Sequence, residues 1–335
     1  MPQVSTCGVR RSNSRPAALI AYSDAVPTKS GLKLGIALPQ GARGGTIDTA
    51  FIREYAQLAE AAGFDDLWTI EQITGRYAVL EPVALLAYLS AVTQRIRLGT
   101  AVLVINLRNP IQLAKSLSSI DHLSGGRLTV GVGLGASTRM YGAFGLSEDR
   151  RVARFIEGVK VMKALWTQPS ASLDGDFFRL EGVGMEPKPL QKPHPPLWFG
   201  AHTEAAQRRA LRYGDGWMGA GSTDLEEFFV ELARVQSMLA EDGRDSSTFS
   251  LSKRVYLSID DDESKARECV ETQLHEFYGL TEPRAQSWAV YGSAGHVLET
   301  LQRLRDAGLT HLMLHPVPAD LPHLETIAGQ IAPQL

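Results

Sequence analysis

The feature that most constrains the fold is a regular alternation of short β-type runs with helical runs from Leu32 onward. In the first unit, Leu32, Leu34 and Ile36 alternate as in a strand, and the apolar residues after Asp48 recur at helical spacing. The expected strands cover residues 32–38, 64–70, 96–105, 128–133, 197–200, 216–219, 250–259 and 309–314. Eight strands, each followed by a helix, predict an α/β fold, a (β/α)8 TIM barrel in residues 31–335. An open, doubly wound sheet is the competing architecture.

Some connections are longer than a plain barrel needs. Residues 169–196 hold six prolines, and Asp174-Gly175 lies between two β-type runs, which predicts a hairpin. We interpret this segment as an insertion over the carboxyl-terminal mouth of the barrel. Loops 136–147 and 280–292 are also expected to shape the pocket.

Residues 1–30 differ from the rest of the chain, because they are rich in Ser, Arg and Pro and have no sustained periodicity. The apolar run 17–22 is too short for an export signal, and no cleavage site follows. We therefore expect a disordered N-terminal extension and a cytoplasmic protein, with no apolar run of membrane-spanning length. A net charge of −3, with scattered Lys and Arg, argues against nucleic acid as the main partner.

In a TIM barrel, chemistry occurs where strands end and βα loops begin. Glu71 follows the second strand and is an acid, a base or a hydrogen-bond anchor. The small residues of Gly200-Ala201-His202-Thr203 lie directly before a helix, where free backbone N–H groups suit a phosphate. An ordinary helix N-cap is the alternative for that turn.

Glycines alternate along the fourth strand at Gly131, Gly133 and Gly135. They either clear space for something flat against the strand or let barrel side chains pack closely. No helix opens on them, so a dinucleotide-binding fingerprint is disfavoured. His311 and His315 share strand parity, but no third ligand is evident, and we expect no metal site.

Many short motifs resemble the bacterial luciferase-like family of flavin-dependent monooxygenases and F420-dependent reductases, in order from residue 32 to about 330. The motifs are KLGI at 33–36, AGFDDLW at 62–68, RLGTAV at 97–102, RNP at 108–110, LSSIDHLSGGR at 117–127, GVGLG at 131–135, PPLWFG at 195–200, GDGW at 214–217 and AGLTHL at 307–312. The resemblance implies a TIM barrel whose pocket faces the carboxyl ends of the strands.

It also implies a set of site residues. Gly99, Thr100, Ala101 and Val102 match a bulge that supports the cofactor ring, with the Ala101–Val102 peptide bond cis. Residues 200–203 match the phosphate-binding turn. A further cofactor contact is expected from Gly133, and catalytic roles are expected from Glu71 and Gln72.

Two residues depart from the family pattern. Many relatives carry His where this chain has Gln72, and Gln cannot titrate. Luciferase has an Arg for the flavin phosphate where this chain has Leu134. Both departures point away from true luciferases and make catalysis by Glu71 an open question.

These residues predict an oxidoreductase that uses F420 for hydride transfer, or reduced FMN for monooxygenation, on a small organic substrate. F420 is narrowly favoured, although basic candidates near the mouth are few: Arg139, Lys253 and Arg254. The rivals are a non-catalytic flavin-binding barrel and a TIM-barrel lyase or aldolase, which would need a catalytic Lys such as Lys253. The family suggests a homodimer.

Overall fold

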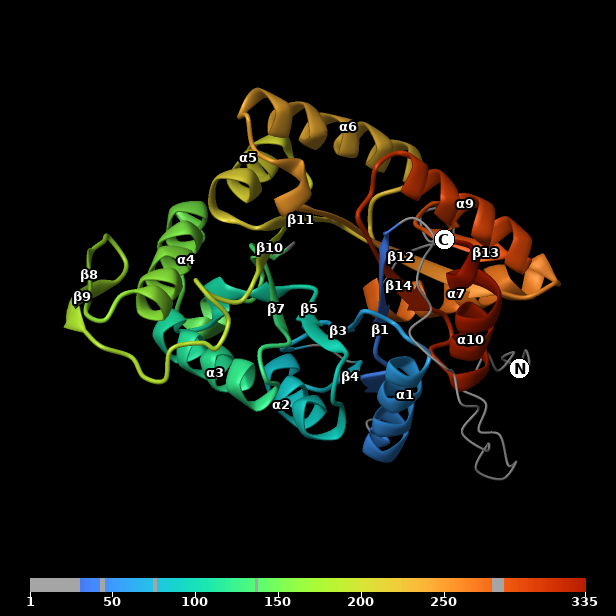
Figure 1. Cartoon of the computed structure of the whole chain (residues 1–335), viewed down its shortest axis with the longest axis horizontal. Helices are drawn as coiled ribbons and strands as arrows, with labels where there is room; N and C mark the ends of the chain where they lie inside the picture. The colour runs from blue at the N-terminus through green and yellow to red at the C-terminus, as the bar shows by residue number, and fades with distance from the viewer. Residues whose placement is uncertain (1–30, 43–45, 75–76, 136–137, 279–285) are drawn as a thin grey trace.

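The structure is a computed structural model that describes residues 31–42, 46–74, 77–135, 138–278 and 286–335. Eight strand positions form a closed ring with helices outside it (Figure 1). Every neighbouring pair in the ring is parallel, and β1 closes it by pairing with both β3 and β14. The strands of the ring, in order, are β1 (Lys33–Ala37), β3 (Asp66–Thr69), β5 (Arg97–Thr100) with β6 (Leu103–Val104), β7 (Leu128–Gly133), β10 (Leu197–Gly200), β11 (Gly216–Gly219), β12 (Ser250–Ile259) and β14 (His311–Pro316). The predicted (β/α)8 barrel is confirmed, and the open sheet is excluded.

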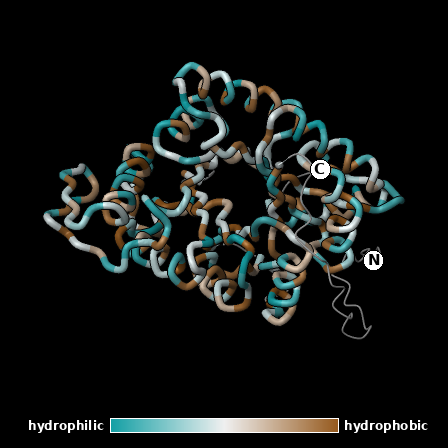
Figure 2. The backbone as a smooth tube through the Cα atoms, viewed as in Figure 1, coloured by the Kyte–Doolittle hydropathy of each residue, from teal (hydrophilic) through white to brown (hydrophobic). Residues whose placement is uncertain are grey.

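The helices begin where the sequence provides caps. Asp48 accepts hydrogen bonds from the first turn of α1, and Pro82 and Pro110 occupy the first positions of α2 and α3. The helices are α1 (Thr49–Ala61), α2 (Pro82–Val92), α3 (Pro110–Leu123), α4 (Arg151–Thr167), α5 (Glu204–Tyr213), α6 (Leu225–Glu241), α7 (Glu263–Tyr278), α9 (Ala294–Asp306) and α10 (Leu321–Thr326). Polar and apolar segments alternate along the outer helices (Figure 2), as expected when one face covers the barrel wall.

Two short additions accompany the ring. β2 (Gly41–Ala42) pairs with β4 (Ala78–Val79). β13 (Ala289–Gly292) pairs with the carboxyl-terminal residues of β12, whereas the sequence predicted only a polar loop there. That part of the prediction for 280–292 is wrong, and residues 279–285 lie outside the described residues, as do residues 1–30 with their predicted disorder.

The hairpin predicted around Asp174-Gly175 is confirmed as β8 (Ala171–Asp174) and β9 (Arg179–Val183), at the edge of the molecule beside α4 (Figure 1). Its expected position over the mouth is wrong. The segment joins the end of a helix to the start of β10, which places it on the opposite side from the βα loops. It packs on α3, where Ser118 donates to the Pro187 carbonyl and Asp121 accepts from Gln191.

The barrel interior has an apolar layer toward the carboxyl ends of the strands and a polar layer at their amino ends. Trp68 and Trp198 lie with ring centroids 5.3 Å apart, and Met218 and Met313 are buried with them. At the amino ends of the strands, the buried His311 lies 2.9 Å from Asp66 and 2.7 Å from the Ser252 hydroxyl. This pairing satisfies polar groups that would otherwise be costly to bury. Within the described residues, no helix is long and apolar enough to cross a membrane.

Candidate active site

A cavity of about 530 Å³, called here the central pocket, opens at the carboxyl ends of the strands. It is lined by the bulge after β5, the ends of β7 and β10, the loop after β11, and residues of α4, β12 and α7. Most of the predicted site residues meet in it: Glu71, Ala101, Val102, Gly133, Gly200, Ala201, His202 and Thr203. Gln72, Gly99 and Thr100 do not line it. A larger groove of about 770 Å³ lies outside the barrel along α3, and none of these residues lines it.

The bulge interrupts the third strand between β5 and β6, and its Ala101–Val102 peptide bond is cis, as predicted. The Val102 side chain lies against glycines of the neighbouring strands. A Cβ at Gly133 would be 2.5 Å from Val102 Cγ2, and one at Gly200 would be 3.2 Å from Val102 Cγ1. The alternating glycines therefore make room for the bulge, while Gly133 and Gly135 also border the pocket.

Gly99 and Thr100 are the last two residues of β5 and support the bulge that follows them. The Thr100 hydroxyl donates to the Gly131 carbonyl at 2.8 Å and accepts from the Gly131 N–H at 2.9 Å. Gly99 packs on the Trp68 ring, where a Cβ would approach within 2.5 Å. These two residues hold β5 in place and lie behind the pocket wall.

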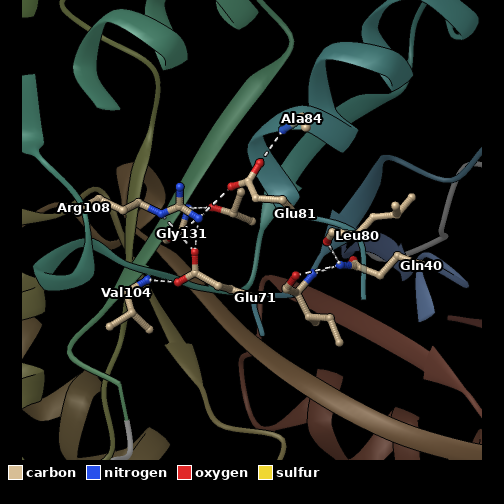
Figure 3. Close-up of polar contacts among 10 residues, drawn as sticks. Gln40, Glu71, Leu80, Glu81, Ala84, Val104, Arg108 and Gly131 are labelled. Atoms are coloured by element: carbon tan, nitrogen blue, oxygen red, sulfur yellow. Dashed lines mark hydrogen bonds and ion pairs between the residues drawn. The ribbon is translucent and has the colours of Figure 1, made fainter. Parts of the chain in front are cut away.

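The Glu71 carboxylate is fully engaged by neighbours (Figure 3). One oxygen accepts from the Val104 N–H at 2.6 Å, and the other contacts the Arg108 guanidinium at Nη2 and, at 3.0 Å, at Nε. Arg108 also reaches Glu81 at 2.7 Å, which caps α2 at Ala84 N. The Glu71 side chain is only 2% exposed. Of the three roles open to Glu71, this geometry is that of an anchor for the backbone beside the bulge.

In this network two carboxylates, Glu71 and Glu81, face the single guanidinium of Arg108. Burial would lower the pKa of Arg108, but the attraction of Glu71 and Glu81 raises it above its ordinary value. Gln40 holds the chain just before Glu71, because its amide donates to the Ile70 carbonyl and accepts from the Ile70 N–H, each at 2.7 Å (Figure 3). The Gln72 side chain, unlike that of Glu71, is not fully hydrogen-bonded: its buried Oε1 has no hydrogen-bond partner among the described residues.

The turn from Gly200 to Thr203 joins β10 to α5. The Thr203 hydroxyl caps the helix by accepting from Ala206 N at 3.4 Å, so the predicted N-cap is confirmed. Trp217 Nε1 donates to the Ala201 carbonyl at 2.7 Å and fixes the turn from behind. The first N–H groups of a helix have no carbonyl partner within it, and the start of α5 lines the central pocket. His202 is exposed there.

His202 contacts the buried Glu231 of α6 and lies 3.6 Å from Glu227. Ligand atoms of these three residues lie within 4.8 Å of one another, a grouping of metal-ligating types that the sequence analysis missed. Burial raises the pKa of Glu231, while His202 and Lys253 act to lower it.

Neighbouring basic residues on β12 point to opposite sides of the barrel wall. Lys253 Nζ donates to the carbonyls of Ala220 and Thr223 at 2.7 and 2.9 Å, and burial lowers the pKa of Lys253 to about 7. It does not line the central pocket, whereas Arg254 does. The pocket also gains Arg151 and Arg209, which sequence reasoning missed because they lie on helices.

Comparisons with known proteins show the family of this chain. Residues 30–328 match the family model described as luciferase-like monooxygenase. An FMNH2-dependent dimethylsulfone monooxygenase of Pseudomonas putida is 29% identical over 71% of this chain and 65% of its own length. An F420-dependent glucose-6-phosphate dehydrogenase of Segniliparus rotundus is 28% identical over 84% of this chain and 92% of its own.

The solved structure of monooxygenase RslO1 from Streptomyces bottropensis superposes with a TM-score of 0.77 and 26% identity, over 90% of this chain and 99% of that one. Uncharacterised mycobacterial proteins are 40% identical over 50% of this chain, and that match spans 58% of their length. The family model covers nearly the whole barrel, so this chain belongs to the luciferase-like monooxygenase family.

Proposed function

We propose that this protein is an oxidoreductase that binds F420, or alternatively reduced FMN, in the central pocket and acts on a small organic molecule. The observation that carries the proposal is the meeting of the bulge at 101–102 with the turn at 200–203 in one cavity. A flat ring with a phosphate tail fits that combination, because the bulge offers a backbone ledge and the turn offers helix N–H groups.

When bound, F420 would accept a hydride from the substrate, or its reduced form would donate one, and reduced FMN would react with oxygen. The chain's own residues bind and orient the cofactor. Thr203 and the backbone of Gly200 to His202 hold the phosphate, and Ala101, Val102 and Gly133 border the ring. Glu71 and Arg108 fix the backbone of Val104 beside the bulge, and Gln72 offers no proton.

Charge around the pocket favours F420 over FMN. Leu134 lines the pocket without a charge, but Arg151 and Arg209 line it as well. These two guanidinium groups, on α4 and α5, suit a cofactor with an acidic tail, and they add to the few basic residues seen in the sequence. One relative uses each cofactor, as their names state.

The test is a fluorescence titration of the apoprotein with F420 and, separately, with FMN. Binding of F420 that is at least tenfold tighter than that of FMN, about 1.4 kcal/mol, supports the proposal. Tight binding of FMN alone would instead make monooxygenation the leading reaction. Failure to bind either cofactor would refute the oxidoreductase assignment.

Two rival functions are tested alongside. A non-catalytic flavin-binding barrel would bind cofactor but would not consume reduced cofactor with any substrate. A lyase or aldolase would need a lysine in the pocket, and Lys253 points away from it. We further propose a cytoplasmic homodimer with no nucleic-acid partner; light scattering in solution tests the homodimer.

A further inference from the structure

Arg254 is a buried cation without an ionic partner in the described residues. It is 9% exposed, lines the central pocket, and forms no ion pair with any described carboxylate. Its Nε–H is buried and has no acceptor among those residues. A buried, unpaired charge is strongly unfavourable, so a group of this kind normally marks a place where a ligand supplies the missing partner.

Aromatic groups fix the position of this guanidinium. Its Nη2 donates to the Tyr278 hydroxyl at 2.8 Å, and its carbon lies 4.5 Å from the centre of the Tyr256 ring. The two tyrosine hydroxyls are 2.6 Å apart. A Cβ at Gly221 would lie 3.1 Å from Arg254 Nε, so the glycine leaves the open edge of the guanidinium accessible. The donor is therefore held in place before any ligand arrives.

Arg254 supplies the positive charge on this side of the pocket. The pKa of the nearby His315 is lowered well below its ordinary value, first by burial and then by Arg254, so that imidazole adds no second charge. His315 Nδ1 is also buried without a partner. The planar fork of one arginine matches one carboxylate with two parallel hydrogen bonds, and a single charge suits a monoanion better than a phosphate monoester.

We propose that Arg254, held by Tyr256 and Tyr278, binds the carboxylate of an organic acid substrate in the central pocket. This inference rests on the proposed function and deepens it, because it assigns a substrate class to the pocket. The carboxylate end would lie on the β12 side, and the phosphate turn at 200–203 lies on the β10 side.

The test compares acids with their own amides, which share shape but carry no charge. The probes are butanoate, octanoate and benzoate with the matching amides, and calorimetry measures their binding to both the cofactor-loaded protein and the apoprotein. At least one acid should bind wild type tenfold or more tightly than its amide, about 1.4 kcal/mol. Arg254→Met should abolish that preference, and Arg254→Lys should retain part of it, because the charge stays and the fork is lost.

Arg209→Met is the matched control, since it removes a guanidinium from the phosphate side of the same pocket. It should weaken cofactor binding and leave the preference for acid over amide intact. Circular dichroism confirms that each variant is folded. The inference is overturned if no acid binds better than its amide, if the preference survives in Arg254→Met, or if a phosphate monoester such as phenyl phosphate is preferred over benzoate. It is also overturned if Arg254→Met loses cofactor affinity alone, which would assign Arg254 to the cofactor. Loss of the proposed function shows separately, as failure of wild type to bind F420 and FMN.

Discussion

Glu71→Gln separates an anchoring role from an acid–base role for this carboxylate. The substitution keeps the shape of the side chain and its capacity to accept from Val104 N, but it removes the charge that faces Arg108. Breaking a buried ion pair typically costs about 3–5 kcal/mol. Arg108 is 18% exposed and keeps Glu81, so we expect a loss of about 2–3 kcal/mol in the free energy of unfolding.

A double-mutant cycle measures the interaction itself. Glu71→Gln, Arg108→Met and the double variant are compared by urea unfolding followed by circular dichroism. An anchoring pair should show a coupling energy of about 1–3 kcal/mol, because Arg108→Met leaves Glu71 buried without a counter-charge and Glu71→Gln leaves Arg108 with Glu81 alone. Cofactor affinity should fall in parallel in both single variants, since both release the backbone beside the bulge. A coupling energy near zero, with turnover lost only in Glu71→Gln, would refute the anchor and restore a direct acid–base role.

Three further outcomes are expected. Thr203→Asp should weaken cofactor binding at least tenfold, about 1.4 kcal/mol, because its charge repels the phosphate; unchanged affinity in a fluorescence titration would place the phosphate elsewhere. The pKa of Lys253 is about 7 in the folded protein and ordinary when unfolded, so the unfolded state holds more protons between pH 7 and about 10, and stability should rise with pH across that window. Lys253→Met should remove this rise in urea unfolding, and an unchanged pH dependence would contradict it. Deletion of residues 1–30 should leave the melting temperature and turnover nearly unchanged, since that segment has no apolar periodicity with which to pack; a large loss of either would show that it docks on the barrel.

The parts of the fold that depend on local pattern could be predicted. Apolar spacing located the ring strands, and Asp48, Pro82 and Pro110 marked helix starts that the structure confirms. The position of 169–196 could not be obtained in the same way. Its contacts with Ser118 and Asp121 are about 70 residues away in sequence, and no local signal encodes them.

The candidate site likewise has parts that local sequence predicts and a part that it does not. Its bulge and its turn at 200–203 follow from short motifs, because each is a property of a few consecutive residues. The partner of Glu71 is 37 residues away, and Arg108 was visible only as part of a family motif. Without that partner, a carboxylate at a strand end is equally compatible with an acid, a base and an anchor.

Lys253 and Arg254 show why the sequence of β12 alone could not predict which of two neighbouring basic residues enters the pocket. Adjacent residues of a strand face opposite sides, so only one of the two can enter the barrel. The usual guide to the inner side is alternation of polar and apolar residues, but β12 is buried on both faces and offers none. The structure resolves the parity through Ser252, which bonds His311 inside the barrel. Arg254 lies two residues after Ser252, so it faces the same side and enters the central pocket. Lys253 faces the opposite side, toward Phe228 of α6. The candidate substrate contact therefore depends on which of two adjacent residues faces inward.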